Sequence, residues 1–437
     1  MEYLPNIIFA IALVLGIGYF ANNVKKLIRN IKLGKDVDVS DNKSQRWKNM
    51  DYIALGQSKM VKRPIAGILH VIVYVGFVII NIEVLEIIID GLFGTHRIGH
   101  QFLPEAVYGF FIGSFEILAI LVLVAVIVLW IRRNTIKLKR FMSSEMTGWP
   151  KSDGNIILYF EVVLMCLFLV MNATDTVFQD FNSGNIVSQF IAPWFDGFSE
   201  ATLHTIERTA WWLHILGILV FLNYLYFSKH LHILLAFPNT YYGKLTPQGQ
   251  FTNNKAVTKE VKLMMDPNVD PFAALPEGAE ATMPDKFGAS DVQDLTWVNL
   301  LNAYTCTECG RCTSECPANL TGKKLSPRKI MMDTRDRLEE VGKNIDANKG
   351  TFVDDGKQLL GDYITTEELW ACTSCNACVE ACPVSIDPLN IIMEMRRYLV
   401  MEQSAAPTEL NNMMTNIENN GAPWPYNQMD RLNWKDE

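Results

Sequence analysis

Residues 306–317 read CTECGRCTSECP and residues 372–383 read CTSCNACVEACP, so one pattern of four cysteines and a proline occurs twice. Both stretches have the spacing C-x2-C-x2-C-x3-C-P. They hold eight of the nine cysteines in the 437-residue chain. Cysteine is therefore concentrated in two short stretches. Any function inferred for the chain must account for them.

This spacing is typical of bacterial ferredoxins, in which three close cysteines hold one [4Fe–4S] cluster and the fourth holds the other. Structural zinc sites usually use separated cysteine pairs, so the spacing disfavours zinc. The pattern predicts that cluster 1 is held by Cys306, Cys309, Cys312 and Cys382, and cluster 2 by Cys372, Cys375, Cys378 and Cys316.

Polarity is divided unevenly along the chain, in which 49% of the residues are hydrophobic and 20% are charged. Residues 1–232 contain 20 Lys and Arg against 18 Asp and Glu, whereas residues 233–437 contain 19 against 29. An apolar, nearly neutral half thus precedes an acidic half. The acidic balance argues against nucleic acid as a partner.

Apolar stretches long enough to cross a bilayer are confined to the first half. They predict a mainly α fold in which a five-helix transmembrane bundle precedes a cytosolic α-helical ferredoxin domain with two [4Fe–4S] clusters. The predicted units are a transmembrane domain at 1–237, a linker at 238–292, the ferredoxin domain at 293–402 and a tail at 403–437. The predicted membrane helices are 4–21, 65–93, 107–131, 156–172 and 209–237.

Basic residues predict the orientation in the membrane. The connections 22–64 and 132–155 hold most of the Lys and Arg of the first half, and loops rich in these residues stay in the cytoplasm. We therefore expect a multi-pass protein of the inner membrane with its N-terminus outside. Both cysteine stretches would then lie in the cytoplasm, where disulfides are rare.

Histidines within apolar helices suggest a haem, because ionisable groups are costly in lipid and usually functional there. His70 and His232 are expected at similar depth near the cytoplasmic side, where they could be the two axial ligands of one b haem. His214, in the outer half of the last helix, is a further candidate haem ligand. The alternative is that histidines at helix ends simply reach the membrane surface, which applies most to His230.

Carboxylates in the outer half of the membrane suggest a quinone site, because quinone chemistry moves protons as well as electrons. Glu83 and Glu86, with His214, are the residues that we expect to line it. The alternative is that these carboxylates face a polar gap between helices or the headgroup region.

The stretches Trp211–His214 and Ser228–His232 resemble the last helix of the respiratory nitrate reductase gamma subunit. This resemblance implies a five-helix cytochrome b with its N-terminus outside. In that family two haem ligands on the last helix are 18 residues apart, as His214 and His232 are, and His70 matches a ligand on the second helix. Ile80 stands where the family has a further ligand, so the resemblance supports one cytoplasmic-side haem better than two.

The stretches Ser326–Lys329, Glu368–Cys372 and Cys382–Pro388 resemble the α-helical ferredoxin component of heterodisulfide reductase. They are also similar to the anchor subunit of glycerol-3-phosphate dehydrogenase and to the iron–sulfur subunit of succinate dehydrogenase. A cytochrome-b-like anchor fused to this domain resembles membrane-bound iron–sulfur oxidoreductases. The implied partner is a cysteine-rich heterodisulfide-reductase-like subunit or a flavoprotein.

Two functions remain open from the sequence. The leading one is an oxidoreductase component that passes electrons between a cytosolic redox partner and the membrane quinone pool through two [4Fe–4S] clusters and one b haem. The chain has no dinucleotide-binding or P-loop motif, so the substrate-converting site is expected on a partner subunit. The alternative is a membrane-tethered ferredoxin that docks partners without haem or quinone chemistry.

Overall fold

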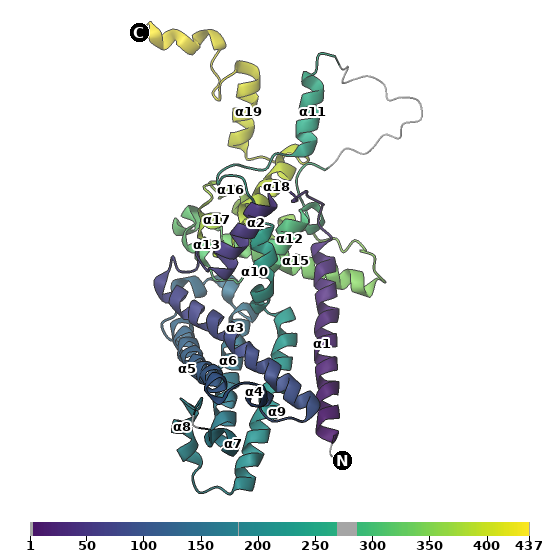
Figure 1. The fold of residues 1–437 in the computed structure, drawn as a ribbon. Coiled ribbons are helices and arrows are strands. Elements are labelled where there is room, and N and C mark those ends of the chain that lie inside the picture. Colours follow the sequence, from purple (N-terminus) through teal and green to yellow (C-terminus); the bar gives the residue numbers. More distant parts are fainter. Residues whose placement is uncertain (1–2, 182, 269–285, 437) are drawn as a thin grey trace.

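The computed structural model describes residues 3–181, 183–268 and 286–436, and these residues fold mainly into helices (Figure 1). In the described residues the only β-type pairing is two isolated bridges, Lys35 with Thr296 and Leu360 with Ile364. Five long helices form one half of the molecule, and shorter helices around the two cysteine stretches form the other. The predicted mainly α class, with five candidate membrane helices before a helical iron–sulfur domain, is confirmed.

The five long helices are apolar and long enough to cross a membrane. The first, third and fourth of them extend past the predicted apolar stretches at one end or both, because a helix continues through polar residues past the lipid-compatible segment. The first apolar stretch ends at residue 21, for example, whereas its helix continues through two lysines and an arginine. The bounds of the five helices are α1 Leu4–Ile31, α3 Pro64–Phe93, α5 Glu105–Asn134, α6 Trp149–Thr174 and α9 Glu200–Tyr224.

The last predicted membrane helix, 209–237, is wrong as a single element. Helix α9 ends at Tyr224, two short 3-10 turns follow, and α10 (His232–Tyr241) begins a new helix. Between the turns Ser228 is extended, with φ −115° and ψ 146°, and its hydroxyl accepts a bond from the His230 N–H at 3.0 Å. The Lys229 N–H donates to Asp153 of α6 at 3.2 Å. Polar contacts thus replace the helical hydrogen bonds at this point, and His214 and His232 lie on different helices.

Helix packing in this half depends on small residues where helices approach closely. The main pairs are α3 with α5, α6 with α9, and α5 with α6, while α1 lies against α9 and α3. The Phe9 ring of α1 is fully buried and lies 5.4 Å from the ring of Trp211. A Cβ atom on Gly91 of α3 would come within 2.6 Å of Phe9, so glycine is needed for α1 to approach α3 there.

The iron–sulfur half is organised around α12 (Trp297–Thr305), α15 (Pro327–Ala347) and α18 (Pro388–Met401). Each begins with a capping residue whose side chain accepts a hydrogen bond from a backbone N–H. The capping residues are Thr296, Ser326 and Asp387 respectively. In α15 and α18 a proline follows the cap at the first helical position, where its missing N–H costs nothing. The cysteine stretches lie in the loops and one-turn helices between these three elements.

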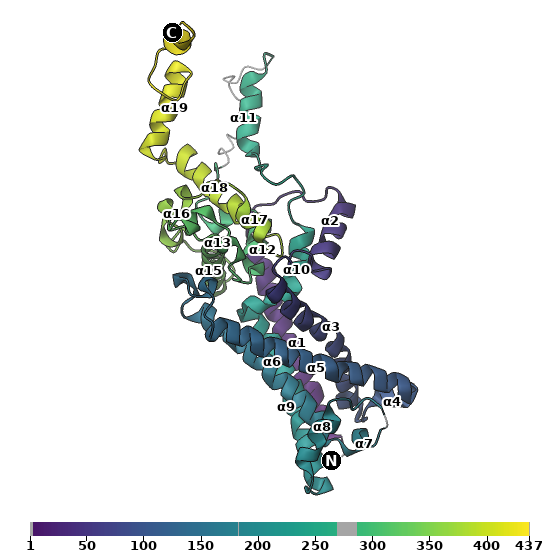
Figure 2. The ribbon, with the colours of Figure 1, turned by 90° about the vertical axis from the view of Figure 1, so that its left-hand side faces the viewer.

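The segments predicted as linker and tail contain helices of their own. Helix α10 continues to Tyr241 and α11 (Lys255–Met265) lies within the predicted linker, whereas the linker prolines Pro271, Pro276 and Pro284 lie outside the described residues. The C-terminal segment contains α19 (Thr408–Asn420). Both α11 and α19 project from the iron–sulfur half, away from the five long helices, in both views (Figures 1 and 2).

The end of α1 connects the two halves. Its Asn30 is buried and donates to the Tyr304 hydroxyl of α12 at 3.0 Å, and Arg29 donates to the Gly342 carbonyl of α15 at 3.0 Å. A Cβ atom on Gly342 would come within 2.5 Å of the Asn30 side chain. The first long helix is therefore seated directly on the iron–sulfur half.

Candidate functional site

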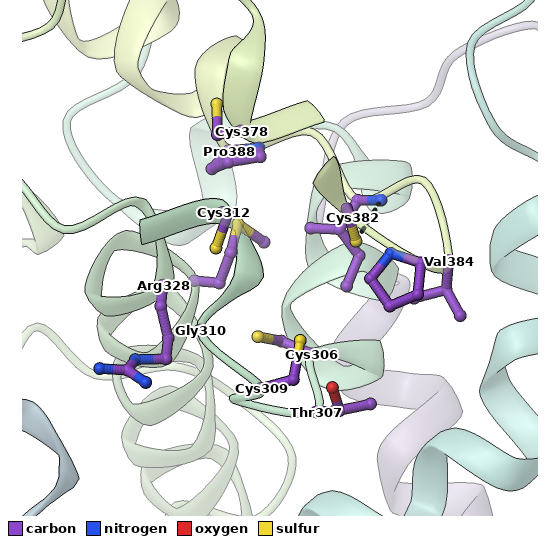
Figure 3. A pocket seen from close by; sticks show the side chains of 13 residues that line it. Cys306, Thr307, Cys309, Gly310, Cys312, Arg328, Cys378, Cys382, Val384 and Pro388 are labelled. Atoms are coloured by element: carbon purple, nitrogen blue, oxygen red, sulfur yellow. Dashed lines mark hydrogen bonds between the residues drawn. The ribbon is translucent and has the colours of Figure 1, made fainter. Parts of the chain in front are cut away.

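The structure brings four predicted ligands of cluster 1 around one cavity (Figure 3). Cys306, Cys309 and Cys312 of the first stretch line it together with Cys382 of the second. Cys378 also borders this cavity, next to Cys312, so the two sets of cysteines are neighbours. The first and second stretches are thus brought together although they are far apart in sequence.

The remaining cysteines form a second group. Burial raises the pKa of the Cys372 thiol, and the nearby Cys316 and Cys375 raise it further. Burial also raises the pKa of Cys378, again with Cys372 and Cys316 among its neighbours. The four cysteines predicted for cluster 2 therefore also lie close together.

Both cysteine loops have the same backbone shape. Two residues after the first cysteine, Glu308 and Ser374 have φ +54° and +58°, and two residues further Gly310 and Asn376 have φ +70° and +61°. The left-handed conformation is uncommon outside glycine, and asparagine is one of the residues that tolerate it best. Since it recurs at equivalent places, the tight winding of three cysteines around a common centre is a property of the motif.

The chemistry of these thiols fits an iron–sulfur cluster. Burial raises the pKa of Cys306 to about 12 and that of Cys382 to about 11, so neither is a thiolate at neutral pH without a compensating cation. Backbone N–H groups already point at the sulfurs, as from Ile386 to Cys382 Sγ at 3.3 Å. In the described part of the chain no three His, Cys, Asp or Glu side chains form a site for one metal ion. The cysteines instead surround a space between them.

The two cysteine groups differ in their surroundings. The loop of the first group contacts the membrane half, where Arg311 donates to the carbonyls of Lys59 at 3.1 Å and Met60 at 3.0 Å. In the second group Cys375 is exposed. The first group therefore contacts the membrane half through its own loop, and the second group includes an exposed cysteine.

His70 and His232 face each other. The ring centres are 6.4 Å apart with an angle of 40° between the planes, although one residue belongs to α3 and the other begins α10. The Nδ1 atom of His232 lies 3.1 Å from the Lys229 carbonyl oxygen, whereas the buried Nδ1 of His70 has no hydrogen-bond partner in the part of the chain that the structure describes. His230, for which the sequence suggests a place at the membrane surface, is a neighbour whose ring lies 5.3 Å from that of His232.

His214 is not part of this pair. It is buried in α9, and its Nδ1 lies 3.0 Å from the Leu164 carbonyl oxygen of α6. Its aromatic neighbour is Phe168, with ring centres 6.1 Å apart. The structure thus separates His214 from the two histidines with which the sequence groups it.

Lys229 connects the first cysteine loop to the histidine pair, and sequence reasoning missed this role. Its ammonium group binds the carboxylate of Glu308, which lies between Cys306 and Cys309 and also accepts from Arg335 at 2.9 Å. Burial alone raises the pKa of Glu308, but Lys229 and Arg335 hold it below its ordinary value. The signal in the sequence is an acidic residue inside a cysteine loop and a single lysine beside two histidines.

At the opposite end of α3 a small pocket collects charged side chains. Glu83 and Glu86 line it together, but His214 does not. Arg97 is buried there and donates to Asp175 at 2.7 Å and to Asn172 at 2.8 Å. One carboxylate oxygen of the buried Glu83 has no hydrogen-bond partner among the residues that the structure describes.

Comparisons with known proteins agree with the iron–sulfur chemistry. Residues 305–386 match the 4Fe-4S dicluster domain family. The "Probable iron-sulfur-binding oxidoreductase FadF" of Bacillus subtilis is 29% identical over 461 residues, covering 99% of this chain and 61% of that protein. The "EtfAB:quinone oxidoreductase" of Syntrophomonas wolfei is 27% identical over 433 residues, covering 92% and 55%. The chain thus spans less than two thirds of the length of these relatives.

A shorter match concerns the iron–sulfur half alone. One component of the ferredoxin/F(420)H(2)-dependent CoB-CoM heterodisulfide reductase from Methanosarcina acetivorans is 35% identical over 108 residues, which cover 24% of this chain and 52% of that protein. No solved structure matches. The resemblance to heterodisulfide reductase is confirmed, whereas the resemblance to the nitrate reductase gamma subunit stays a prediction.

Replacing Lys229 by Met is expected to destabilise the protein by about 3 kcal/mol, because it leaves the buried Glu308 carboxylate with one cation fewer. The double variant Lys229→Met/Glu308→Gln should recover part of this loss, since the buried side chain at position 308 is then neutral. The free energy of unfolding is measured by guanidinium titration of the detergent-solubilised chain.

The matched control is Lys62→Met, which removes an exposed pair with Glu380 and should cost less than about 1 kcal/mol. Equal losses for Lys62→Met and Lys229→Met would show that the Lys229–Glu308 contact has no special weight.

Proposed function

We propose that this chain is a membrane-bound electron-transfer subunit that passes electrons between a redox partner and membrane quinone. Two [4Fe–4S] clusters and one b haem are its proposed carriers. The observation that carries the proposal is the connection through Lys229, whose side chain binds the first cysteine loop and whose carbonyl lies against His232. The names of the relatives, an iron–sulfur-binding oxidoreductase and an EtfAB:quinone oxidoreductase, support it.

The proposed cluster ligands are the two sets that the structure groups. When bound, the clusters supply one-electron transfer, which the thiols themselves cannot do. Cysteines from both stretches contribute to each set, so cluster binding would hold the two halves of the ferredoxin domain together. The proposed sets are Cys306, Cys309, Cys312 and Cys382 for cluster 1, and Cys372, Cys375, Cys378 and Cys316 for cluster 2.

The proposed haem ligands are His70 and His232. Metal–imidazole bonds are about 2 Å long and the ring is about 2 Å across, so two axial imidazoles place their centres roughly 6 Å apart. The observed 6.4 Å fits this requirement. The Lys229 carbonyl fixes the Nδ1 proton of His232 and leaves its Nε2 free to bind, as is usual for metal-ligating histidines.

The surroundings of the two cysteine groups support an order along the route. The group with the exposed Cys375 is the one that a redox partner can reach. The group around Cys306 lies next to the Lys229 connection and so toward the histidines. We propose a flavoprotein of the EtfAB kind as the partner, with a cysteine-rich heterodisulfide-reductase-like subunit as the second candidate. In this proposal the N-terminus lies outside the inner membrane and the iron–sulfur domain in the cytoplasm.

The proposed quinone site is the charged pocket at the outer end of α3. Glu83 supports this role because it is buried, one of its oxygens has no partner within the described residues, and proton transfer to a quinone needs such a group. Glu86 accepts the Gly99 N–H at 2.8 Å and is the second acidic group in the pocket. His214 lies deeper in the bundle, so in this proposal it borders the site without lining the pocket.

Replacing Cys375 by Ser is expected to remove one cluster. Two cubane clusters contain about eight iron atoms per chain, so the iron content should fall to about four. Iron and acid-labile sulfide are measured on protein purified without oxygen. The control is Cys166→Ser in α6, which should keep the full content, and an unchanged content in Cys375→Ser would contradict the assignment.

Replacing His70 by Ala is expected to abolish a haem b band in the dithionite-reduced spectrum, because one axial ligand is lost. The iron–sulfur absorbance should remain, which separates loss of haem from unfolding. His204→Ala is the control and should keep the band. If the unaltered protein has no haem b band, the proposal fails in favour of a tethered ferredoxin without haem.

Replacing Glu83 by Gln is expected to slow quinol-driven reduction of the haem at least about tenfold, since the carboxylate can no longer take up a proton. Stopped-flow spectroscopy in detergent with a soluble quinol measures this rate. Glu105→Gln, an exposed acid at the same end of the bundle, is the control. Equal rates for both variants would exclude Glu83 from the quinone reaction.

A further inference from the structure

A cavity of about 440 Å³ lies where α3 begins and α5 ends, at the boundary between the long helices and the iron–sulfur half. Two of its cations precede α3, one lies in the last turn of α5, and two follow α5. Its lining contains no acidic residue. The cations are Lys62, Arg63, Arg132, Lys139 and Arg140.

Acids of the iron–sulfur half neutralise only part of this charge. Lys62 pairs with Glu380, and Arg63 pairs with Glu315 at 2.6 Å. For the other three cations, Arg132, Lys139 and Arg140, the described residues provide no acidic side chain within ion-pair distance. The Nε atom of Arg140 is also buried, and no described residue is its hydrogen-bond partner.

Several positive charges lie close to Arg140 and affect its pKa. Burial lowers the pKa of Arg140, and Arg63, Arg311 and Arg132 lower it further, while Cys309 opposes the shift. Cations this close repel one another unless an anion lies between them. The lining of the cavity thus holds five cations, of which two pair with acids of the iron–sulfur half.

Below the cations, the same ends of the two helices expose apolar side chains. Ile65 and Ile68 of α3 are both 60% exposed, and Ile127 and Ile131 of α5 are 44% and 39% exposed. In a membrane these side chains face acyl chains. The combination of a cationic cavity at the boundary and apolar side chains beneath it has the chemistry of a phospholipid, with a headgroup above and hydrocarbon below.

We propose that this cavity binds the phosphate group of an anionic phospholipid. A free phosphate ion would meet the cations but would leave the exposed isoleucines without a counterpart, which favours the lipid. The inference rests on the membrane insertion in the proposed function and is independent of haem and quinone. The two proposals can therefore fail separately. The protein could transfer electrons without retaining lipid, and it could retain lipid without transferring electrons.

The test compares phosphatidylglycerol with phosphatidylcholine on the purified full chain. Native mass spectrometry counts retained lipid after titration with each lipid in detergent. Phosphatidylglycerol should bind more tightly, and Arg132→Gln/Lys139→Gln should weaken its binding by roughly tenfold or more, because each basic residue near an anionic lipid contributes to affinity. Arg140 is left intact since its guanidinium lies near the thiol of Cys309 in the first cysteine loop.

The matched control is Lys259→Gln/Lys262→Gln on α11, which removes the same charge far from the long helices (Figure 1). It should bind phosphatidylglycerol as the unaltered chain does. Equal weakening by both double variants, or equal binding of both lipids, would overturn the proposal. Displacement of the lipid by millimolar inorganic phosphate would also overturn it, since the cavity would then be a site for a free anion.

Discussion

The buried contact between Lys229 and Glu308 determines how the two halves of the molecule meet. Both groups are removed from water, and a charge in such a place is stable only if its partner is present. Glu308 is held by the left-handed turn between two cysteines, and Lys229 by the break after α9. In an unbroken helix the Lys229 N–H would bond to a carbonyl four residues earlier, whereas here it bonds to Asp153. The break after α9 and the turn in the first cysteine loop thus position the two residues of the same contact.

The features that depend on local pattern are predictable from the sequence. The cysteine spacing is contained in twelve residues, so the grouping of Cys306 with Cys309 and Cys312 requires no knowledge of the fold. The five apolar helices are predictable because hydropathy averages over a window as long as the membrane is thick. Where the outcome depends on distant residues the prediction fails, as at Ser228, where Asp153 of another helix captures the backbone of the next residue.

The histidine predictions also depend on backbone structure that a local sequence pattern does not determine. Their predicted depth assumes a continuous helix that the structure does not contain, yet His70 and His232 still face each other because the new helix α10 begins at His232. His214 is grouped with them because it lies 18 residues before His232. The helix breaks at Ser228, so this spacing no longer places the two side chains on one face of a helix. Spacing carries geometric information only while the backbone between two residues stays regular.

The two ends of the long helices differ in the balance of charged side chains. At the end away from the iron–sulfur half, Arg97 is matched by Asp175 and Asn172, and Glu83 keeps an oxygen without a partner among the described residues. At the end next to the iron–sulfur half, cations outnumber acids, and Arg140 acts on Cys309 as well as on the other arginines. A positive charge stabilises the more negative, reduced state of a nearby cluster, since net charge around a cluster sets its potential. An anion in the boundary cavity would screen the same guanidinium, so the lipid that occupies the cavity and the electron that reaches the first cysteine group would act on one another through Arg140.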